Sequence, residues 1–100
     1  MVKMKSRVEI LSEMETLKPA LSARCHVRRI GIFGSVARDT HSQTSDVDIL
    51  VEFDAPVSGF SFVHLKEMLS SYLGMKVDLV TPGGLHPLLR ERILRDVVYV

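Results

Sequence analysis

Three aspartates have the types and spacing of a metal-dependent phosphate site. Asp46 and Asp48 stand at positions i and i+2 at the start of a predicted strand, so both carboxylates lie on one face. Neighbouring carboxylates resist joint ionisation unless a cation lies between them, and Mg²⁺ prefers such hard oxygen ligands. Asp78 stands in the otherwise apolar run 77–80, where we expect a buried carboxylate. A metal shared by the three aspartates would compensate for that burial.

A turn upstream of the aspartates has the residues of a phosphate-binding loop. Gly34 and Ser35 follow a predicted buried strand and precede a short helical turn, for which Ser35 is a candidate N-cap. Glycine lets the backbone approach a ligand closely, and free N–H groups at such a turn bind phosphate. Arg38 follows one turn later and could reach the same anion. Together with the aspartates, this turn indicates a nucleoside triphosphate held through a metal.

The apolar pattern predicts helices and strands that alternate along the chain and position these residues. Apolar residues at steps of three or four from Val8 to Leu21 indicate an amphipathic helix, which Pro19 breaks or kinks. A second amphipathic helix over 62–73 ends at Gly74. The remaining elements are strands over 29–33, 47–53 and 76–81, a polar loop over 39–45, a turn at Gly83 and Gly84, a last helix over 85–94 and a short strand over 97–100. The predicted class is therefore α/β or α+β, with a small mixed sheet flanked by helices.

Length and composition limit the chain to one small domain. Its 100 residues, 46% of them apolar and 25% charged, are predicted to form a single domain over 1–100. No apolar run reaches the roughly 18–20 residues that span a bilayer, and the basic N-terminal residues lack the apolar stretch of a secretory signal. The single cysteine, Cys25, excludes an internal disulfide framework and favours a reducing, cytoplasmic location.

The net charge of +1 conceals an asymmetry along the chain. Residues 1–29 carry +4, residues 30–84 carry −4 and residues 85–100 carry +1. This balance argues against a general nucleic-acid binder, which is basic overall. It fits a site that concentrates carboxylates and needs a cation.

The motifs resemble those of the DNA polymerase beta-like nucleotidyltransferase superfamily. The likeness rests on Gly34-Ser35, ten intervening residues, Asp46-Val47-Asp48, Arg38 within the gap and Asp78 on a later strand. It covers most of the chain and is nearest to the minimal nucleotidyltransferases that are paired with a HEPN-domain protein. One position departs from the family pattern, because Asp39 stands where the family often has glycine and adds a negative charge near the triphosphate loop.

The resemblance implies a two-metal transfer of a nucleoside monophosphate. It implies that ATP is bound by Gly34, Ser35 and Arg38 and that the catalytic, metal-binding residues are Asp46, Asp48 and Asp78. In this family pattern the first two aspartates bridge two Mg²⁺ ions and the triphosphate, while the third joins the ion nearer the acceptor and helps to activate its hydroxyl. The expected function is transfer of AMP to a hydroxyl of a HEPN-domain partner, as the antitoxin of a toxin–antitoxin pair.

Two other functions stay open at this stage. A module with this fold could bind nucleotide and neutralise its partner by contact alone, or the nucleotide could be transferred to a small molecule or to RNA. The intact set of aspartates favours the enzyme. The lack of a second domain that would form a substrate cleft argues against a small-molecule acceptor. Edge-to-edge pairing of the terminal strand could also produce a homo-oligomer, and no membrane contact is expected.

Each candidate site residue also has a simpler interpretation. Asp46 and Asp48 could be a turn residue and a solvent-facing strand residue, and Asp78 could face water at a sheet edge. Gly34 and Ser35 could form an ordinary strand-to-helix turn. Arg38 could be a plain surface arginine.

The other polar residues are expected to be structural or to lie at the protein surface. Glu52 shares a strand face with Asp48 by the period of two, and we expect it to be exposed. Cys25 is expected to be a partly buried, inert thiol. The four histidines lack metal-ligand spacing and are expected to be structural or surface residues: His26, His41, His64 and His86.

Overall fold

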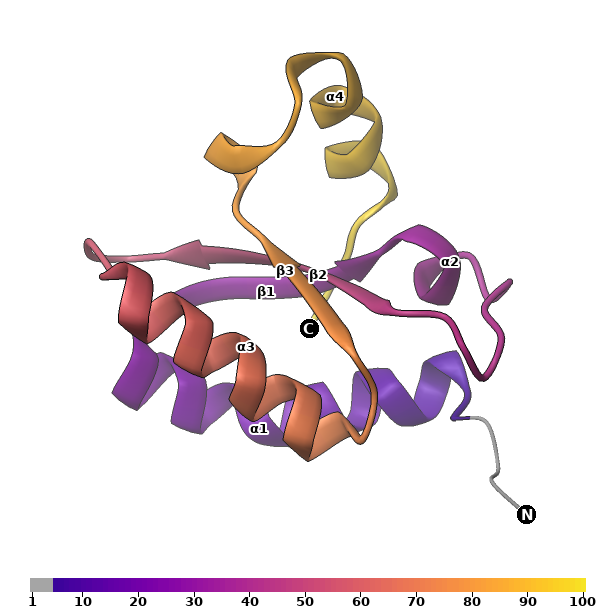
Figure 1. Cartoon of the computed structure of the whole chain (residues 1–100), viewed down its shortest axis with the longest axis horizontal. Helices are drawn as coiled ribbons and strands as arrows, with labels where there is room; N and C mark the ends of the chain where they lie inside the picture. Colours follow the sequence, from indigo (N-terminus) through magenta and orange to yellow (C-terminus); the bar gives the residue numbers. More distant parts are fainter. Residues whose placement is uncertain (1–4) are drawn as a thin grey trace.

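A mixed four-stranded sheet forms the centre of the computed structural model, which describes residues 5–100 (Figure 1). Its strands lie in the order β3-β2-β1-β4, with β1 (Val27–Phe33) antiparallel to both β2 (Val47–Phe53) and β4 (Val98–Tyr99). β2 runs parallel to β3 (Val77–Val80), and a helix between them makes the crossover that a parallel pair requires. The predicted class, a small mixed sheet with flanking helices, is confirmed.

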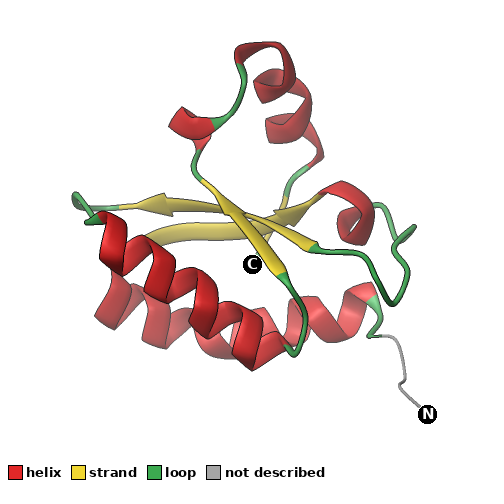
Figure 2. Ribbon diagram, in the orientation of Figure 1, coloured by secondary structure: helices red, strands yellow, loops and turns green. Residues whose placement is uncertain are grey.

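Helices lie on both sides of this sheet (Figure 2). The long helices α1 (Arg7–Cys25) and α3 (Gly59–Leu73) cover one face, below the sheet in Figure 1. The short helix α2 (Gly34–Ala37) follows β1, and the segment with the 3-10 helix η1 (Pro82–Gly84) and α4 (Pro87–Asp96) rises on the other side. Among the described residues, no helix is long and apolar enough to cross a membrane. The first four residues of the basic N-terminal run lie outside the described part of the chain.

The hydrophobic core lies between the sheet and the helices α1 and α3. Alternate residues of β2, Val47, Ile49 and Val51, are fully buried in it, as the period of two requires. The other buried members of this core are Ile10, Met14, Leu21, Val27, Ile30, Ile32, Val36, Leu65, Leu69, Leu73, Val77 and Leu79. Burying one large apolar side chain contributes about 1.5–3 kcal/mol. The core therefore fixes the helices on one face and leaves the opposite face for polar groups.

The first helix differs from its prediction in two respects. Pro19 lies inside α1 without ending it, because this position is exposed and water can reach the carbonyl that loses its amide partner. Val8 is 71% exposed, and Ile10 occupies the core position in its place. Steps of three and four residues fit two neighbouring faces of a helix, so the apolar pattern alone does not show which of these faces is buried.

The third helix agrees with its prediction at its C-terminal end. Gly74 ends α3 in the left-handed conformation, with φ of 66°. The helix starts at Gly59, three residues before the predicted boundary, because the Ser58 hydroxyl caps its N-terminus. Val63 and Tyr72, which the apolar pattern assigned to the core, are exposed.

The last helix contributes no fully buried residue. Gly83 and Gly84 form the predicted turn, here as part of η1, and α4 begins with Pro87 in its first turn. Leu88 and Leu89, which the apolar pattern assigned to an inward face, are exposed. α4 therefore stands away from the core and packs against α2.

An ion-pair cluster on the open face of the sheet is centred on Glu52. Arg28 Nη2 lies 2.8 Å from Glu52 Oε1, and Arg29 Nη2 lies 2.6 Å from Glu52 Oε2. The Arg29 guanidinium also stacks over the ring of Tyr99 at 4.1 Å. Burial raises the pKa of Glu52, but the hydrogen bonds and charges of the two arginines outweigh it and lower the pKa overall. The expectation of an exposed Glu52 was wrong: its side chain is 15% exposed and joins β1, β2 and β4.

Candidate active site

Two of the predicted aspartates stand side by side on neighbouring strands. Asp48 and Asp78 are direct partners in the parallel register of β2 and β3. Because Val47 and Ile49 face the core, the side chains of the two aspartates project from the opposite face, on strands about 4.8 Å apart. Asp46 immediately precedes β2 and is exposed. The fold thus brings together carboxylates that are 30 residues apart in the sequence, as positions 48 and 78 show.

The electrostatics of this group are those of crowded carboxylates. Partial burial raises the pKa of Asp48, the negative charges of Asp78 and Asp46 raise it further, and the charge of Arg38 partly offsets these effects. The expectation that Asp78 is buried was wrong, because β3 is an edge strand and Asp78 faces water. Water, rather than a buried partner, solvates Asp78, while Asp48 remains a carboxylate that a cation would stabilise.

The donor set fits a metal shared with a substrate better than a metal held by protein alone. Within residues 5–100, no group of three or more His, Cys, Asp or Glu is arranged to hold a metal ion. Asp48 and Asp78 nevertheless offer hard carboxylate oxygens from adjacent register positions. Mg²⁺ commonly binds one or two carboxylates and completes its octahedron with water and substrate phosphates. The residues present therefore fit Mg²⁺ bound together with a triphosphate.

Gly34 lies directly beside this group, at the junction of β1 and α2. Its φ of 72° is in the left-handed region, and a Cβ at this position would run into the carboxylate of Asp48. Phe33, the preceding residue, is the register partner of Asp48. Glycine is therefore required here both by backbone conformation and by contact with the second aspartate.

Ser35 and Arg38 occupy the two ends of the short helix α2. Phe33, not Ser35, is the N-cap residue of α2, and no side chain caps this end, so the predicted capping role of Ser35 was wrong. The Ser35 carbonyl accepts a hydrogen bond from the Thr40 amide at 2.9 Å, which closes the turn after α2. Arg38 is the C-cap residue, is exposed and lines the same cavity as Gly34.

The loop that joins the two halves of the site is fixed to the start of α1. Arg7 Nε donates a hydrogen bond to the Ala37 carbonyl at 3.0 Å, and His41 Nε2 lies 2.7 Å from the Lys5 carbonyl. His41 is 8% exposed, which confirms a structural histidine, and its Nδ1 has no partner among the described residues. Asp39 adopts a φ of 59°, in the left-handed region that glycine occupies readily and aspartate tolerates. This conformation gives a physical reason for a glycine preference at that position.

A cavity of about 260 Å³ between α2 and α4 adds residues that the sequence analysis did not identify. It is lined by Phe33, Gly34, Arg38, Leu89, Arg92, Ile93 and Asp96. Arg38 and Arg92 supply positive charge, and Leu89 and Ile93 supply an apolar wall. Arg92 reaches this cavity because η1 turns the chain back over the sheet before α4 begins. The available sequence signal was the helical spacing of Leu89, Arg92 and Ile93, at i, i+3 and i+4, which puts an arginine on the same face as two apolar residues.

Comparisons with known proteins show what this chain is similar to. A family model described as "Nucleotidyltransferase domain" matches residues 9–100. The protein adenylyltransferase MntA of Thermococcus cleftensis is 44% identical over 92 residues, which cover 92% of this chain and 93% of that protein.

Two solved structures are also similar to this chain in fold. One described as a minimal nucleotidyltransferase superposes with a TM-score of 0.83 at 33% identity and covers 97% of this chain and 98% of that one. A toxin–antitoxin structure with AMP-PNP gives a TM-score of 0.71 at 25% identity, over 89% of this chain and 72% of that chain.

Proposed function

The chain belongs to the nucleotidyltransferase domain family, and from this premise we propose that it is a metal-dependent protein adenylyltransferase. It transfers AMP from ATP to a hydroxyl of a HEPN-domain partner and acts as the antitoxin of that pair. The name of the Thermococcus relative supports the reaction, and the toxin–antitoxin likeness supports the partner. In this proposal residues 1–100 form one transferase domain.

The observation that carries the proposal is the contact between the phosphate turn and the carboxylate pair. Gly34 approaches Asp48 so closely that no side chain fits between them, and Asp78 is the register neighbour of Asp48. A triphosphate in the adjoining cavity would meet Arg38 and Arg92 with its charged oxygens while its metal-bound face meets the aspartates.

The residues then have separate roles in one in-line displacement. The acceptor hydroxyl oxygen bonds to the α-phosphorus, the bond from that phosphorus to the bridging oxygen breaks, and pyrophosphate leaves. Bound Mg²⁺ would supply charge neutralisation at the attacking and leaving oxygens. Asp46 and Asp48 would hold the metal–triphosphate unit, and Asp78, the register neighbour of Asp48, would accept the hydroxyl proton. Arg38, Ser35 and the Gly34 backbone orient the phosphates.

The test is transfer of label from ATP that is radioactive at the α-phosphate. Wild-type protein and Asp48→Asn are incubated with Mg²⁺ and the HEPN-domain protein of the same source. Label on the partner that resists RNase, is lost to protease and requires both Asp48 and Mg²⁺ supports the proposal. RNase-sensitive label would assign the acceptor to RNA. Neutralisation of the partner without any label would assign the chain to the contact-only class, and either result overturns the proposal.

A further inference from the structure

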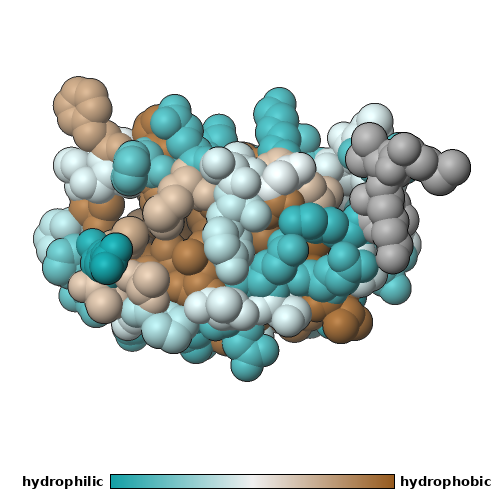
Figure 3. All heavy atoms as spheres, turned by 90° about the horizontal axis from the view of Figure 1, so that it is seen from below, coloured by the Kyte–Doolittle hydropathy of each residue, from teal (hydrophilic) through white to brown (hydrophobic). Residues whose placement is uncertain are grey.

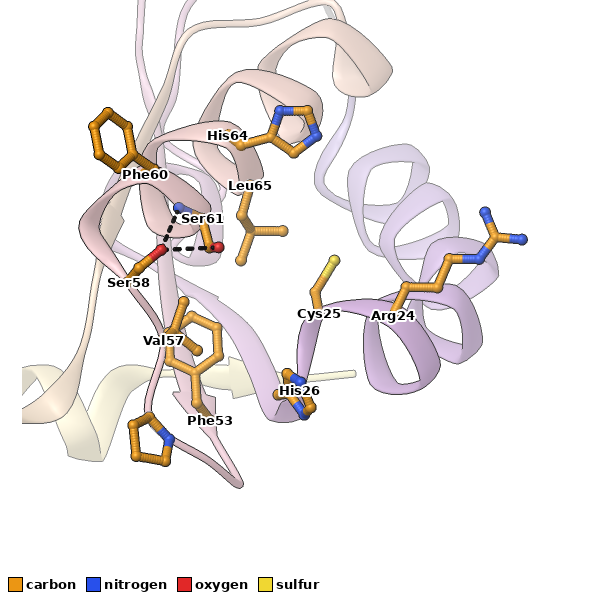
Figure 4. A pocket seen from close by; sticks show the side chains of 11 residues that line it. Arg24, Cys25, His26, Phe53, Val57, Ser58, Phe60, Ser61, His64 and Leu65 are labelled. Carbon is orange, nitrogen blue, oxygen red and sulfur yellow. Dashed lines mark hydrogen bonds between the residues drawn. The ribbon is translucent and has the colours of Figure 1, made fainter.

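A second cavity, larger than the one beside Gly34, lies away from the aspartates. It has a volume of about 520 Å³ and opens between the end of α1, the loop after β2 and the start of α3 (Figure 4). Phe53 lies in its wall and is five residues along β2 from Asp48, which places the two roughly 16 Å apart. In Figure 3, which shows the face with α1 and α3, apolar atoms surround a hollow at one end of the molecule. The cavity is therefore separate from the candidate active site.

Apolar side chains form part of the lining of this cavity, beside the polar Ser58 and Ser61. Phe53, Val57 and Leu65 line it, and the Cys25 thiol points into it (Figure 4). The Phe53 ring is held by an edge-to-face contact with Phe62, at a centroid distance of 6.4 Å. These packed side chains give the cavity an apolar wall against which an apolar group could pack.

The rim exposes further apolar surface that the fold does not cover. Phe60 is 92% exposed although it lines the cavity, and Val63, one turn further along α3, is 51% exposed. Burying one such side chain contributes about 1.5–3 kcal/mol. A ligand confined to the cavity would leave Val63 uncovered, whereas a polypeptide segment that crosses the rim would cover both residues.

The polar part of the rim indicates the charge of its partner. The ionisable side chains that line the cavity are Arg24, His26 and His64, apart from the Cys25 thiol, and no carboxylate lines it. The nearest carboxylate in a described ion pair is Asp54, whose Oδ1 lies 3.6 Å from His26 Nδ1. An acidic segment complements such a rim, since opposite charges across an interface steer association and fix its register.

We propose that this cavity docks an acidic segment of the protein acceptor through one bulky apolar side chain, remote from the transfer centre. This inference rests on the proposed function, since that function supplies the acceptor. A second copy of this chain is a poorer occupant, because a two-fold interface centred on this cavity would bring Arg24 of both copies into one interface without a lining carboxylate to offset them. The cavity increases affinity for the acceptor without contributing a group to the reaction.

The test separates binding of the acceptor from transfer. Phe60→Ser and Arg24→Glu are compared with wild type in titrations against the HEPN-domain protein without ATP, and then in labelling with α-labelled ATP. We expect each variant to raise Kd and the KM for the acceptor about tenfold or more, with kcat and ATP affinity unchanged. Phe60 and Arg24 are both exposed, so the variants should fold normally, which thermal unfolding checks.

Two control variants make the result specific. Val8→Ser removes another exposed apolar side chain, 71% exposed, from the opposite end of α1. Arg24→Lys keeps the positive charge at position 24. Both should bind the acceptor within about twofold of wild type. Unchanged binding by Phe60→Ser and Arg24→Glu overturns the docking proposal, as does a wild-type dimer that Phe60→Ser dissociates. Absence of label with wild type and with every variant, with the binding differences intact, would instead overturn only the proposed transfer.

Discussion

At the scale of single residues, Asp48 is the point where stability and the proposed chemistry conflict. Burial and the charges of Asp78 and Asp46 raise the pKa of Asp48, so its ionised form is less favourable in the folded chain than in the unfolded one. A bound cation would relieve this repulsion. Carboxylates whose pKa is raised by burial and by neighbouring negative charges are typical of functional sites.

Asp48→Asn is therefore expected to stabilise the metal-free protein while it removes transfer activity. The amide carries no charge to be repelled, so the urea midpoint at pH 7 in EDTA should rise without a change in m. Loss of a metal ligand costs several kcal/mol at the transition state, which predicts at least a ~100-fold fall in labelling rate. Glu15→Gln, an exposed carboxylate on α1, is the control and should change neither quantity. A destabilised Asp48→Asn would contradict this account of the site.

Gly34→Ala is expected to damage both fold and site. Its φ of 72° would be strained for alanine, and the added Cβ would displace the Asp48 carboxylate. We predict a loss of about 1–3 kcal/mol in the free energy of unfolding and loss of measurable ATP binding by calorimetry. Gly83→Ala is the matched control, because a Cβ there meets no atom within 4 Å. Normal ATP binding by Gly34→Ala would exclude a close approach of this backbone to the triphosphate.

Residue types and spacing were sufficient to predict which aspartates meet, but not their burial. The alternation of elements predicted a sheet that brings Asp78 to Asp48, because a helix between two strands favours a parallel pair. Whether Asp78 is buried depends on which strand forms the edge, and the local sequence around it is apolar in either case. The catalytic roles of Asp46, Asp48 and Asp78 stay predictions, as do the nucleotide-binding roles of Gly34, Ser35 and Arg38.

At the scale of elements, the open face of the sheet is held by polar contacts where no helix covers it. Glu52 on β2 contacts Arg28 and Arg29 on β1, and Tyr99 Oη on β4 lies 3.4 Å from Glu52 Oε2. β4 has only two residues in the ladder, so this cluster adds a second attachment for the C-terminal strand. The period of two predicted which face Glu52 occupies, but its partners depend on the register.

The pH dependence of stability should report on this cluster. The pKa of Glu52 is below its ordinary value of 4.5, so its contribution is complete above about pH 4.5 and is lost as the pH falls through the folded-state pKa. Glu52→Gln should therefore lower the free energy of unfolding by about 1–2 kcal/mol at pH 7. The difference from wild type should shrink toward pH 3 in urea titrations, and Glu67→Gln should show neither effect. If the difference in the free energy of unfolding between wild type and Glu52→Gln grew as the pH fell, the stabilising role of ionised Glu52 would be refuted.

The position of α4 predicts a nucleotide contact from Arg92. It lines the cavity of Gly34 and Arg38, and a hydrogen bond to a charged group contributes about 1.5–3 kcal/mol. Arg92→Ala should thus raise the KM for ATP by roughly 10- to 100-fold and leave the KM for the acceptor unchanged. Arg95→Ala, from the last turn of the same helix but outside the cavity lining, is the control. Equal effects of the two substitutions would indicate a general charge effect.

At the scale of the whole molecule, the two ends of β2 carry different surfaces. The end at Asp48 gathers carboxylates beside the cavity of Arg38 and Arg92, while the end at Phe53 forms the larger cavity with Arg24 in its lining. The charge asymmetry of the sequence already indicated an acidic middle between basic ends. It did not indicate the far cavity, since Arg24, Phe53 and Phe60 meet only when α1 and α3 pack side by side on the sheet.

This separation predicts that acceptor binding and chemistry are independent in a double-mutant cycle. Sites more than about 10 Å apart without shared partners usually have additive effects, within roughly 0.5 kcal/mol. The Kd of Asp48→Asn/Phe60→Ser for the acceptor should therefore equal that of Phe60→Ser alone, and the labelling rate at saturating acceptor should equal that of Asp48→Asn alone. Titration and single-turnover labelling of the four proteins measure both quantities. A coupling free energy well above 0.5 kcal/mol would mean that the acceptor reaches both ends as one rigid body, so that docking at Phe53 also positions the hydroxyl at Asp48.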